Sequence, residues 1–295
     1  MAVMPTLIKE NPLESSYTKH DQLYKELIDT FFEEFLEVFF PDIHNNLNFQ
    51  QIRPLSEEVF TSMTDGEARR LDIVIEAKLK ETDVVVIVHV EPQSYKQTNF
   101  NERMYHYFSM LHNKYRKPII PIAVLSYDDD WEENQYTLAF PFFHVITFNY
   151  LTLHLRKKNW RDYIGSDNPV AAALLSEMGY TKKERVQVKK EFLRMIIRMN
   201  LNPAKQRLIY GFFESYLKLT EVEEEQLMRE IDKLPEANKI FEIPISYEEK
   251  GKEIGKEIRT REIAIQMLEK NVDVDFIAEV TKLDIVEIEK LKQQL

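Results

Sequence analysis

The chain contains no cysteine and little glycine, and each shortage excludes a class of chemistry. Without cysteine there is no disulfide scaffold, no thiol nucleophile and no cysteine-based zinc site. The six glycines occur at no spacing that builds a phosphate-cradling loop ahead of a lysine or a dinucleotide fingerprint after a strand. Nucleotide-driven motors and simple nicotinamide enzymes are therefore poor candidates.

Long apolar runs and an excess of basic residues are also missing. The longest apolar run, around Val84–Val88, has the length of a strand, whereas a membrane span needs about 18 residues. Residues 1–12 contain no basic stretch followed by an apolar one, so we expect no secretory signal, no membrane partner and a cytoplasmic location. The net charge of −11 argues against a chain-wide grip on nucleic acid, but it is compatible with an acidic metal site and a local basic rim.

The first half of the chain alternates between helical and strand patterns. Apolar residues at helical spacing predict one helix over Asp21–Phe40, ended by Pro41, and another over Thr98–Lys114. Runs of alternating or β-branched residues predict strands at Phe49–Leu55, Arg70–Lys78, Val84–Glu91, Pro118–Tyr127 and Phe142–Phe148. The order helix, three strands, helix, two strands predicts an α/β sandwich around one mixed sheet.

Beyond about Trp160 the strand patterns stop. Helices are predicted at Pro169–Met178, Lys182–Met199, Pro203–Leu219 and Val222–Leu234, several of them opening with proline or a capping residue. A charged helix over Tyr247–Lys270 and a pair of helices over Phe276–Leu295 follow. We therefore predict a core over 1–165, a helical region over 166–245 packed on or beside it, and a C-terminal charged helix and helix hairpin over 246–295.

The C-terminal helix pair has two interpretations. Ile277–Leu291 loosely fits a helix-turn-helix, but the segment is acidic overall and Lys282 stands where the turn glycine belongs. We favour a helix hairpin that serves packing or self-association, which would make the protein a homo-oligomer.

Three polar residues on two adjacent strands form the candidate site. Asp72 lies in one strand and Glu91 at the exit of the next, and the short Lys80–Asp83 turn predicts an antiparallel hairpin that brings the two carboxylates together. Gln93 is two residues beyond Glu91, so an extended chain places both side chains on one face. Two converging carboxylates suit Mg²⁺ or Mn²⁺. The alternative is that each acid is an ordinary surface residue of its strand.

The residues around this site carry a resemblance. RRLDIVIEAKL followed by VVVIVHVEPQSY resembles the D…(D/E)xK hairpin of the PD-(D/E)XK nuclease superfamily. More narrowly, it is similar to the bacterial recombination-promoting nuclease or putative transposase family, in which a D-x-V strand precedes H-[IV]-E-x-Q. HDQLYKELIDTFFEEFLEVFFP resembles that family's first helix, and ERMYHYFSMLHNKYRKPIIPIAVLSY resembles its next helix and fourth strand. The resemblance covers roughly residues 20–165.

The resemblance implies a restriction-endonuclease-like core with DNA endonuclease activity that depends on a divalent metal. It implies that Asp72 and Glu91 are the metal ligands and that Gln93, in place of the usual lysine, is the polar partner of the attacking water. Glu26 matches an acidic position that many superfamily members use as an accessory ligand, and it is equally well interpreted as a helix-surface glutamate. The competing hypothesis is a nuclease fold that has lost its activity and serves as an interaction or regulatory module. True transposition is a third hypothesis, for which the chain offers no evident end-reading domain.

Basic residues near the predicted site also have two interpretations. Arg69 and Arg70 precede the first strand of the hairpin, and further basic residues flank the next helix: Arg103, Lys114, Arg116 and Lys117. They are placed to contact phosphates of DNA. The commoner role of such charges is to keep a strand edge or a helix end in contact with water, and we expect that role for most of them.

Overall fold

The computed structural model describes most of the first 243 residues and single stretches beyond them. The described residues are 12–55, 60–61, 68–69, 73–80, 85–93, 99–127, 134–243, 264, 267–268, 273–281, 288 and 292. The chain divides into two compact units, 1–230 and 231–295. Each unit is described by itself.

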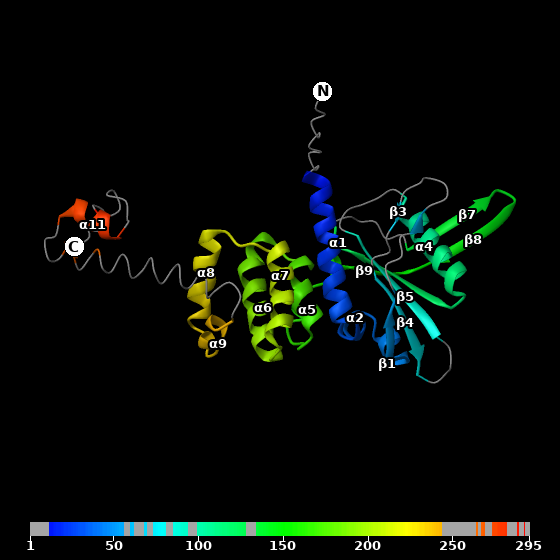
Figure 1. The fold of residues 1–295 in the computed structure, drawn as a ribbon, viewed down its shortest axis with the longest axis horizontal. Helices are drawn as coiled ribbons and strands as arrows, with labels where there is room; N and C mark the ends of the chain where they lie inside the picture. The colour runs from blue at the N-terminus through cyan, green and yellow to red at the C-terminus, as the bar shows by residue number, and fades with distance from the viewer. Residues whose placement is uncertain are drawn as a thin grey trace, which may run out of the picture. The chain divides into compact units, whose positions relative to one another are not determined.

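One mixed five-stranded sheet organises the first unit (Figure 1). Its strands, in spatial order, are β1 (Leu47–Pro54), β4 (Ile73–Leu79), β5 (Val85–Gln93), β6 (Ile119–Leu125) and β9 (Leu151–His154). The pairs β1/β4 and β4/β5 are antiparallel, whereas β5/β6 and β6/β9 are parallel. This sheet, flanked by helices, confirms the predicted mixed α/β class.

Helices cover both faces of the sheet. The buried His89 of β5 contacts the ring of Tyr107 from α4 (Phe100–Tyr115), so α4 lies on the His89 face. Its strand neighbours Val88 and Val90, also fully buried, point to the other face because side chains alternate along a strand. Helix α1 (Pro12–Thr30) contacts β4 and β5 on that second face and also contacts the helices that follow the sheet.

The predicted helix over residues 21–40 is two helices. Helix α1 ends at Thr30, α2 runs over Phe32–Phe39, and the short α3 over Pro41–Asn46 leads into β1. The break falls at Phe31, whose φ of −128° and ψ of 42° leave the helical region. Phe31 and Phe32 are both buried at this break, although consecutive residues on one straight helix lie about 100° apart around its axis. The sequence pattern of a wide apolar face did not reveal this bend.

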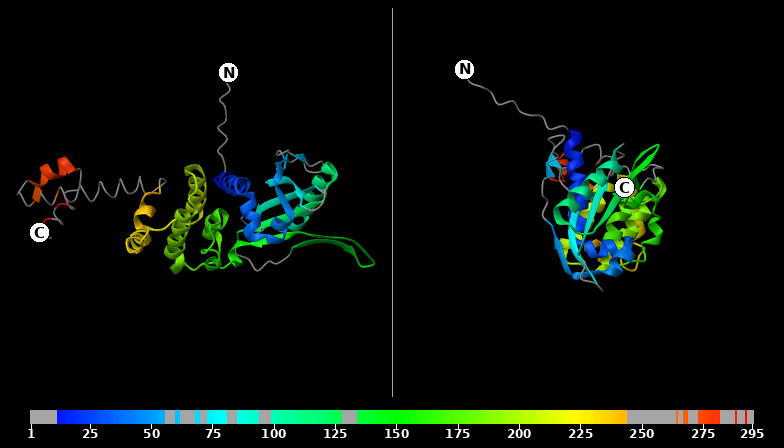
Figure 2. Two further views of the ribbon diagram at one scale, coloured as in Figure 1. Left: turned by 90° about the horizontal axis from the view of Figure 1, so that it is seen from below. Right: turned by 90° about the vertical axis from the view of Figure 1, so that its right-hand side faces the viewer.

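Two further pairs of strands stand outside the main sheet. Residues Phe60–Thr61 and Ala68–Arg69 form the short pair β2 and β3. Strands β7 (Gln135–Phe140) and β8 (Phe143–Asn149) form a longer two-stranded ribbon that reaches away from the rest of the unit (Figure 2, left). The strand predicted at 142–148 is β8, whereas β7 and the short β9 were not predicted.

Beyond β9 the first unit is helical, as predicted. The described elements are η1 (Leu155–Lys157), η2 (Trp160–Asp162), α5 (Pro169–Leu174), η3 (Leu175–Glu177), η4 (Lys182–Glu184), α6 (Arg185–Met199), α7 (Pro203–Tyr216) and α8 (Glu221–Ile231). Helices α5 and α7 begin with proline, and the side chains of Asn168 and Asn202 accept hydrogen bonds from backbone N–H groups of the first turn. These are the capping signals that made the helices predictable from the sequence.

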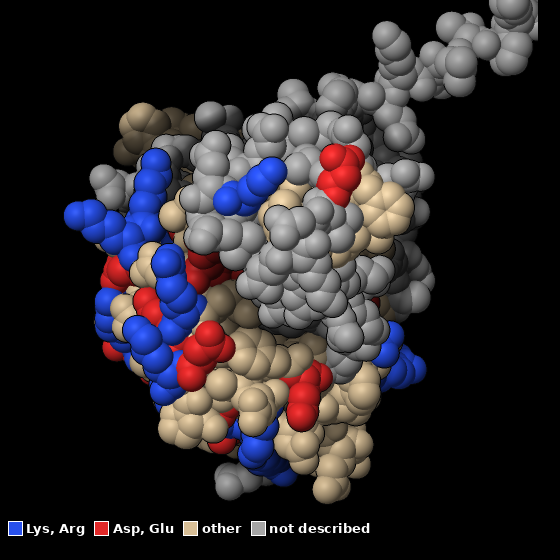
Figure 3. All heavy atoms as spheres, turned by 90° about the vertical axis from the view of Figure 1, so that its left-hand side faces the viewer, with Lys and Arg blue, Asp and Glu red and all other residues tan. Residues whose placement is uncertain are grey.

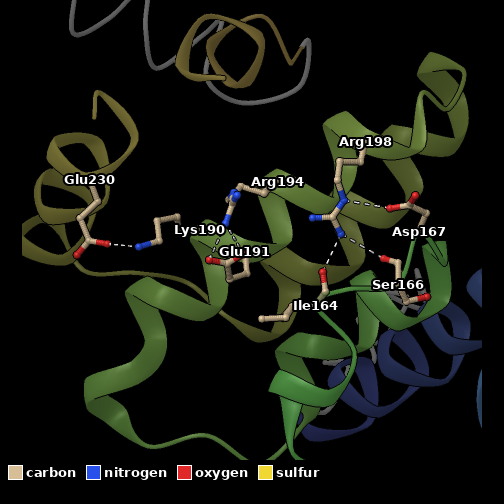
Figure 4. A network of polar contacts seen from close by, with 8 residues as sticks. All are labelled: Ile164, Ser166, Asp167, Lys190, Glu191, Arg194, Arg198 and Glu230. Carbon is tan, nitrogen blue, oxygen red and sulfur yellow. Dashed lines mark hydrogen bonds and ion pairs between the residues drawn. The ribbon is translucent and has the colours of Figure 1, made fainter. Parts of the chain in front are cut away.

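Charged side chains of both signs lie interspersed on the face of the molecule seen in Figure 3. Helix α6 shows how they are used (Figure 4). Lys190 pairs with Glu230, Arg194 pairs with Glu191 on its own helix, and Arg198 pairs with Asp167. These basic residues are engaged in ion pairs, of which the Lys190–Glu230 pair joins α6 to α8, so they do not form a free basic patch.

In the second unit, the described helices are α9 (Ala237–Phe241) and α11 (Val274–Thr281). The buried residues Ala264, Leu268, Ile277 and Ile288 form one apolar cluster there. Most of the predicted charged helix and the second half of the predicted helix pair, including Lys282, lie outside the described residues. No helix in the described parts of the chain has the length and apolar character needed to cross a bilayer.

Candidate functional site

The hairpin of β4 and β5 is where the sequence places the candidate site. The two strands are antiparallel, as predicted, and their register pairs Lys78 with Val85 at the turn and Ile73 with Val90 at the far end. The next residue of β4 in that direction, Asp72, lies outside the described residues. Its placement as a metal ligand therefore stays a prediction.

Glu91 and Gln93 lie at the carboxyl end of β5. Their backbones pair with those of Ala123 and Leu125 in the parallel neighbour β6. The side chains of both residues lie outside the described part of the structure. The strand assignment and the spacing of two residues agree with the prediction, and the roles of the side chains remain predictions.

His89, two residues before Glu91, is a fully buried polar residue of this strand. Its ring centroid lies 5.6 Å from that of Tyr107, at an interplanar angle of 82°. Burial, together with the nearby positive charge of Arg103, lowers the pKa of His89 to about 3. The imidazole is therefore neutral at neutral pH.

Arg103 brings a positive charge from α4 to this part of the sheet. Its guanidinium carbon lies 5.1 Å from the centroid of the Phe100 ring and 5.9 Å from that of Tyr107. Because Tyr107 also contacts His89, Arg103 lies beside β5 at the level of His89. His89 is two residues before Glu91 in that strand. A guanidinium held against aromatic rings is a preorganised donor for phosphate or carboxylate oxygens.

Of the other basic residues singled out near the hairpin, Lys114 and Lys117 have local partners, whereas Arg70 and the side chain of Arg69 lie outside the described residues. Lys117 forms an ion pair with Glu76 of β4, and Arg53 of β1 lies 3.7 Å from the same carboxylate. The Lys114 ammonium lies 5.0 Å from the centroid of the Tyr115 ring. Arg116 is the left-handed residue that ends α4, with φ of 52°. Lys117, Arg53 and Lys114 are therefore engaged locally.

Glu26 is an exposed residue of α1. The same helix turns Tyr24, Leu27 and Ile28 into the core, so Glu26 lies on the side away from it. Helix α1 covers the face of the sheet opposite α4, which separates it from the face of His89 and Arg103. The structure does not bring Glu26 to that face, and its accessory role stays a prediction.

A second polar group, which the sequence did not reveal, lies at the same edge of the sheet. The carboxyl ends of the three parallel strands meet there, since Gln93 pairs with Leu125 and Leu125 with His154. Just beyond these ends, Arg156 Nε donates to the backbone oxygen of Ser126 at 3.3 Å, and its Nη2 lies 3.7 Å from Glu177 Oε1.

Glu177 is the most perturbed acid of this second group. Its side chain is 5% exposed, and burial raises its pKa to about 7, although Arg156 and a hydrogen bond with Ser126 act in the opposite direction. Tyr24 of α1 adjoins the group, and burial together with the charge of Glu177 raises the pKa of its phenol well above the usual value. The residues of this group are far apart in the sequence and form no motif, so sequence patterns gave no signal for it.

Among the residues that the structure describes, no three His, Asp or Glu side chains gather as a metal site. That set leaves out Asp72 and the side chain of Glu91. No protein-family profile, curated protein or solved structure matches this chain.

Proposed function

We propose that this protein is a metal-dependent endonuclease that hydrolyses phosphodiester bonds of DNA. Asp72 and Glu91 bind Mg²⁺ (or Mn²⁺), and Gln93 orients the attacking water. The observation that carries the proposal is the antiparallel register of β4 and β5, in which Ile73 is opposite Val90. If this pairing continues by one residue, Asp72 stands opposite Glu91, and opposing residues have Cβ atoms about 5 Å apart.

The donor set fits a hard divalent cation. Two carboxylates supply the oxygen ligands that Mg²⁺ and Mn²⁺ prefer, and the chain has no cysteine to favour a softer metal. When bound, such a cation polarises the phosphodiester and lowers the pKa of a nearby water.

The remaining groups hold the substrate and the water. We expect Glu91 and Gln93 to share the face of His89, on which α4 packs, because side chains alternate along a strand. Arg103 of α4 supplies donors for a phosphate oxygen on that face. The amide of Gln93 accepts a hydrogen bond from the water and orients it, but an amide does not take up the proton. His89, being neutral, adds no charge that would repel the cation.

The order of elements gives further support. Helix α1, strands β1, β4 and β5, helix α4 and strand β6 follow one another in the order expected from the resemblance. The chain that connects β5 to the parallel strand β6 passes through α4, which packs against the sheet. The connection therefore carries Arg103 back over the strand that holds Glu91.

Nicking of supercoiled plasmid tests the proposal. Wild-type protein is expected to nick with Mg²⁺ and not with a chelator, and Asp72→Asn and Glu91→Gln should each lower the rate by more than about 100-fold, since even residues that only support metal ligands give 10–100-fold effects. Glu76→Gln is the matched control, because it removes a carboxylate from the same hairpin that already pairs with Lys117. Circular dichroism checks that every variant is folded.

Each outcome of the nicking assay is informative. Equal nicking by wild type and Asp72→Asn would show a contaminating nuclease and contradict the proposal. Wild type that binds plasmid without nicking it would support the interaction module instead. Glu26→Gln separates the two interpretations of that residue, because an accessory ligand loses activity on substitution and a surface residue keeps it.

The register itself is testable by cross-linking. The chain has no cysteine, so any disulfide in a double variant belongs to the two introduced residues. Asp72→Cys with Glu91→Cys should form a disulfide readily, because opposing residues have Cα atoms about 4.5–5.5 Å apart, within the range a disulfide spans. Asp72→Cys with Val90→Cys should not, because in the proposed register the two side chains would point to opposite faces of the sheet. The reverse result would exclude the proposed ligand pair.

A further inference from the structure

The ribbon of β7 and β8 projects from the first unit with an apolar surface that nothing in the described structure covers. The strands are joined through Pro141 and Phe142 (Figure 2, left). Among the described residues, neither strand pairs with a third one. An isolated two-stranded ribbon is only marginally stable in water. Packing its apolar residues against another surface would therefore stabilise it.

The base of the ribbon has such a cover. Tyr136 pairs with Phe148 across the two strands. The Tyr136 ring stacks on Tyr105 of α4, with centroids 5.2 Å apart and an interplanar angle of 18°. The Phe148 ring lies 5.0 Å from that of Phe108, and Phe148 is 7% exposed. Helix α4 thus anchors this end of the ribbon through one of its faces.

The same face continues beyond the end of this cover. Leu138 and Phe140 follow Tyr136 at intervals of two residues along β7. After a shift of one residue in the register between Leu138 and Ala139, Phe140 pairs with Phe143 at the tip. The exposed fractions are 43% for Leu138, 54% for Phe140 and 59% for Phe143. Phe142 in the turn is 88% exposed, and its ring stacks on Phe140 with centroids 5.8 Å apart. The outer half is therefore an aromatic surface in contact with water.

We call the ribbon over residues 135–149 the arm. We propose that its outer half is a self-association surface, through which the arms of two copies of the chain cover one another about a twofold axis. The exposed area of its four largest apolar residues amounts to about 500 Å² per copy, given the typical size of these side chains. Two arms together therefore bring roughly 1,000 Å² of apolar surface, about the smallest area at which an interface is specific.

The charge pattern favours this partner over nucleic acid. From Asn134 to Leu155 the chain contains no Lys, Arg, Asp or Glu, although these residues make up 30% of the whole. A ribbon that binds DNA needs cations for the phosphates, and this one has no lysine or arginine. Two identical uncharged arms meet without repulsion, and a twofold axis lets each present the same face to the other.

The unpaired strand edges disfavour the third possible partner, a lipid bilayer. Each outer edge of the ribbon exposes backbone N–H and C=O groups, which another strand or water satisfies. Inside the hydrocarbon of a membrane those groups would have no partner, and open sheet edges are not found there. In a dimer of arms, the edges either pair with one another or stay in water.

Sedimentation of the full-length chain at micromolar concentrations tests the proposal. Wild type is expected to be dimeric, and Phe142→Ser with Phe143→Ser should raise the dimer dissociation constant by at least about 100-fold, since each aromatic burial accounts for about tenfold or more. Val222→Ser is the matched control, because Val222 is 71% exposed on α8 and should leave the dimer intact. All three substituted residues are exposed, so folding is not at risk.

Cross-linking provides a second readout. Phe142→Cys in the cysteine-free chain should give a disulfide-linked dimer on oxidation, and Val222→Cys should not. A wild type that stays monomeric, or a dimer that the arm substitutions leave unchanged, would overturn the proposal. A monomer that floats with lipid vesicles and loses this binding in the arm variant would assign the surface to membranes instead. The arm variants leave the β4–β5 hairpin unchanged. Plasmid nicking therefore tests the proposed nuclease activity independently of self-association.

Discussion

The sheet and the helices that follow it bury their interiors by different means. In β4 and β5 the buried residues are mainly aliphatic, with Ile73, Ile75, Val88 and Val90 at most 2% exposed. The helical stretch 155–231 has an apolar core too, but it also buries five polar or charged groups: Asn168, Ser176, Glu177, Lys189 and Glu191. A buried charge is tolerated only when it is paired, so the stability of the helices depends on partners and on pH. The stability of the sheet depends on shape and volume, and its buried His89, whose pKa is about 3, lowers it only as the pH falls below about 6.5.

The largest expected effect comes from Lys189, which is 1% exposed on α6 and pairs with Glu214 at 2.6 Å and Glu224 at 2.8 Å. Lys189→Met should lower the free energy of unfolding by about 3 kcal/mol, because it leaves two carboxylates without their shared cation. This is the low end of the usual range, since the two glutamates are 23% and 20% exposed and keep part of their hydration. Urea unfolding followed by circular dichroism measures the loss.

Lys190→Met is the matched control on the same helix. Lys190 is 20% exposed and pairs with one carboxylate, that of Glu230, which is 32% exposed (Figure 4). Its replacement should lower the free energy of unfolding by less than about 1 kcal/mol. Equal losses for the two lysines would mean that burial of the cation does not distinguish them, and the contrast with the sheet would fail.

The second prediction concerns the pH dependence that Glu177 gives to the helical region. Its pKa is about 7 in the folded chain, against an ordinary value of 4.5. Between these values the folded state holds a proton that the unfolded state has released, so stability falls as pH rises from about 4.5 to about 7. The fall amounts to about 3 kcal/mol, at 1.36 kcal/mol for each pKa unit. Glu177→Gln should remove this loss of stability. The stability of the variant relative to wild type should therefore increase as the pH rises from about 4.5 to about 7.

Glu184 supplies the control of opposite sign. The backbone and side chain of Thr181 donate to its carboxylate, and Arg161 pairs with it, which lowers the pKa of Glu184 to about 2. Its contribution to stability is present above about 4.5 and is lost as the pH falls toward 2. Glu184→Gln should therefore be less stable than wild type at pH 8, with the difference shrinking in acid. If both variants behaved alike, the assignment of the pH effect to burial would be wrong.

The contrast between the aliphatic sheet and the helices with buried charges also explains which features could be predicted from the sequence. The strand over residues 84–91 was predictable because nearly every residue is β-branched, and Pro203 marked the start of α7 because proline fits a first helical turn. The ion pairs of Lys189 were not predictable, since its partners lie on two other helices and a charged residue on a helix ordinarily faces water.

For the candidate site, the sequence predicted the antiparallel hairpin, because the turn between the two strands is short, whereas the register of the pair came from the structure. Arg103 was noted only as one of several cations, and its position beside His89 depends on how α4 packs across the sheet. The cluster around Glu177 depends on long-range packing in the same way. Strand β7 was not predicted because its residues are not enriched in β-branched side chains. Of the two strands of the ribbon, only β8 was recognised from its sequence.

The third prediction concerns the point where the helical region approaches the end of the sheet. A Cβ atom added at Gly179 would lie 2.5 Å from the backbone oxygen of Arg156 and 3.3 Å from that of Lys158. Gly179→Ala should therefore lower the free energy of unfolding by about 2 kcal/mol, because the backbone has to shift. Gly211→Ala is the control: in α7 nothing lies within 4 Å of the added atom, and alanine should stabilise the helix by about 0.5–1 kcal/mol. Two losses of equal size would contradict the proposed close approach.

The smallest effect tests the sheet by itself. Ile75 is 2% exposed in β4 and has no ionisable group, so Ile75→Val removes one buried methylene and should lower the free energy of unfolding by about 1 kcal/mol. The loss should be the same at pH 5 and at pH 8, because no proton binds or leaves with the substitution. Unfolding in urea at both pH values measures it, with Glu177→Gln as the variant whose difference from wild type does change. A loss for Ile75→Val that varied with pH would show that the sheet is coupled to the buried charges of the helices. The two regions would then share one determinant of stability, since hydrophobic volume alone has no means of sensing a proton.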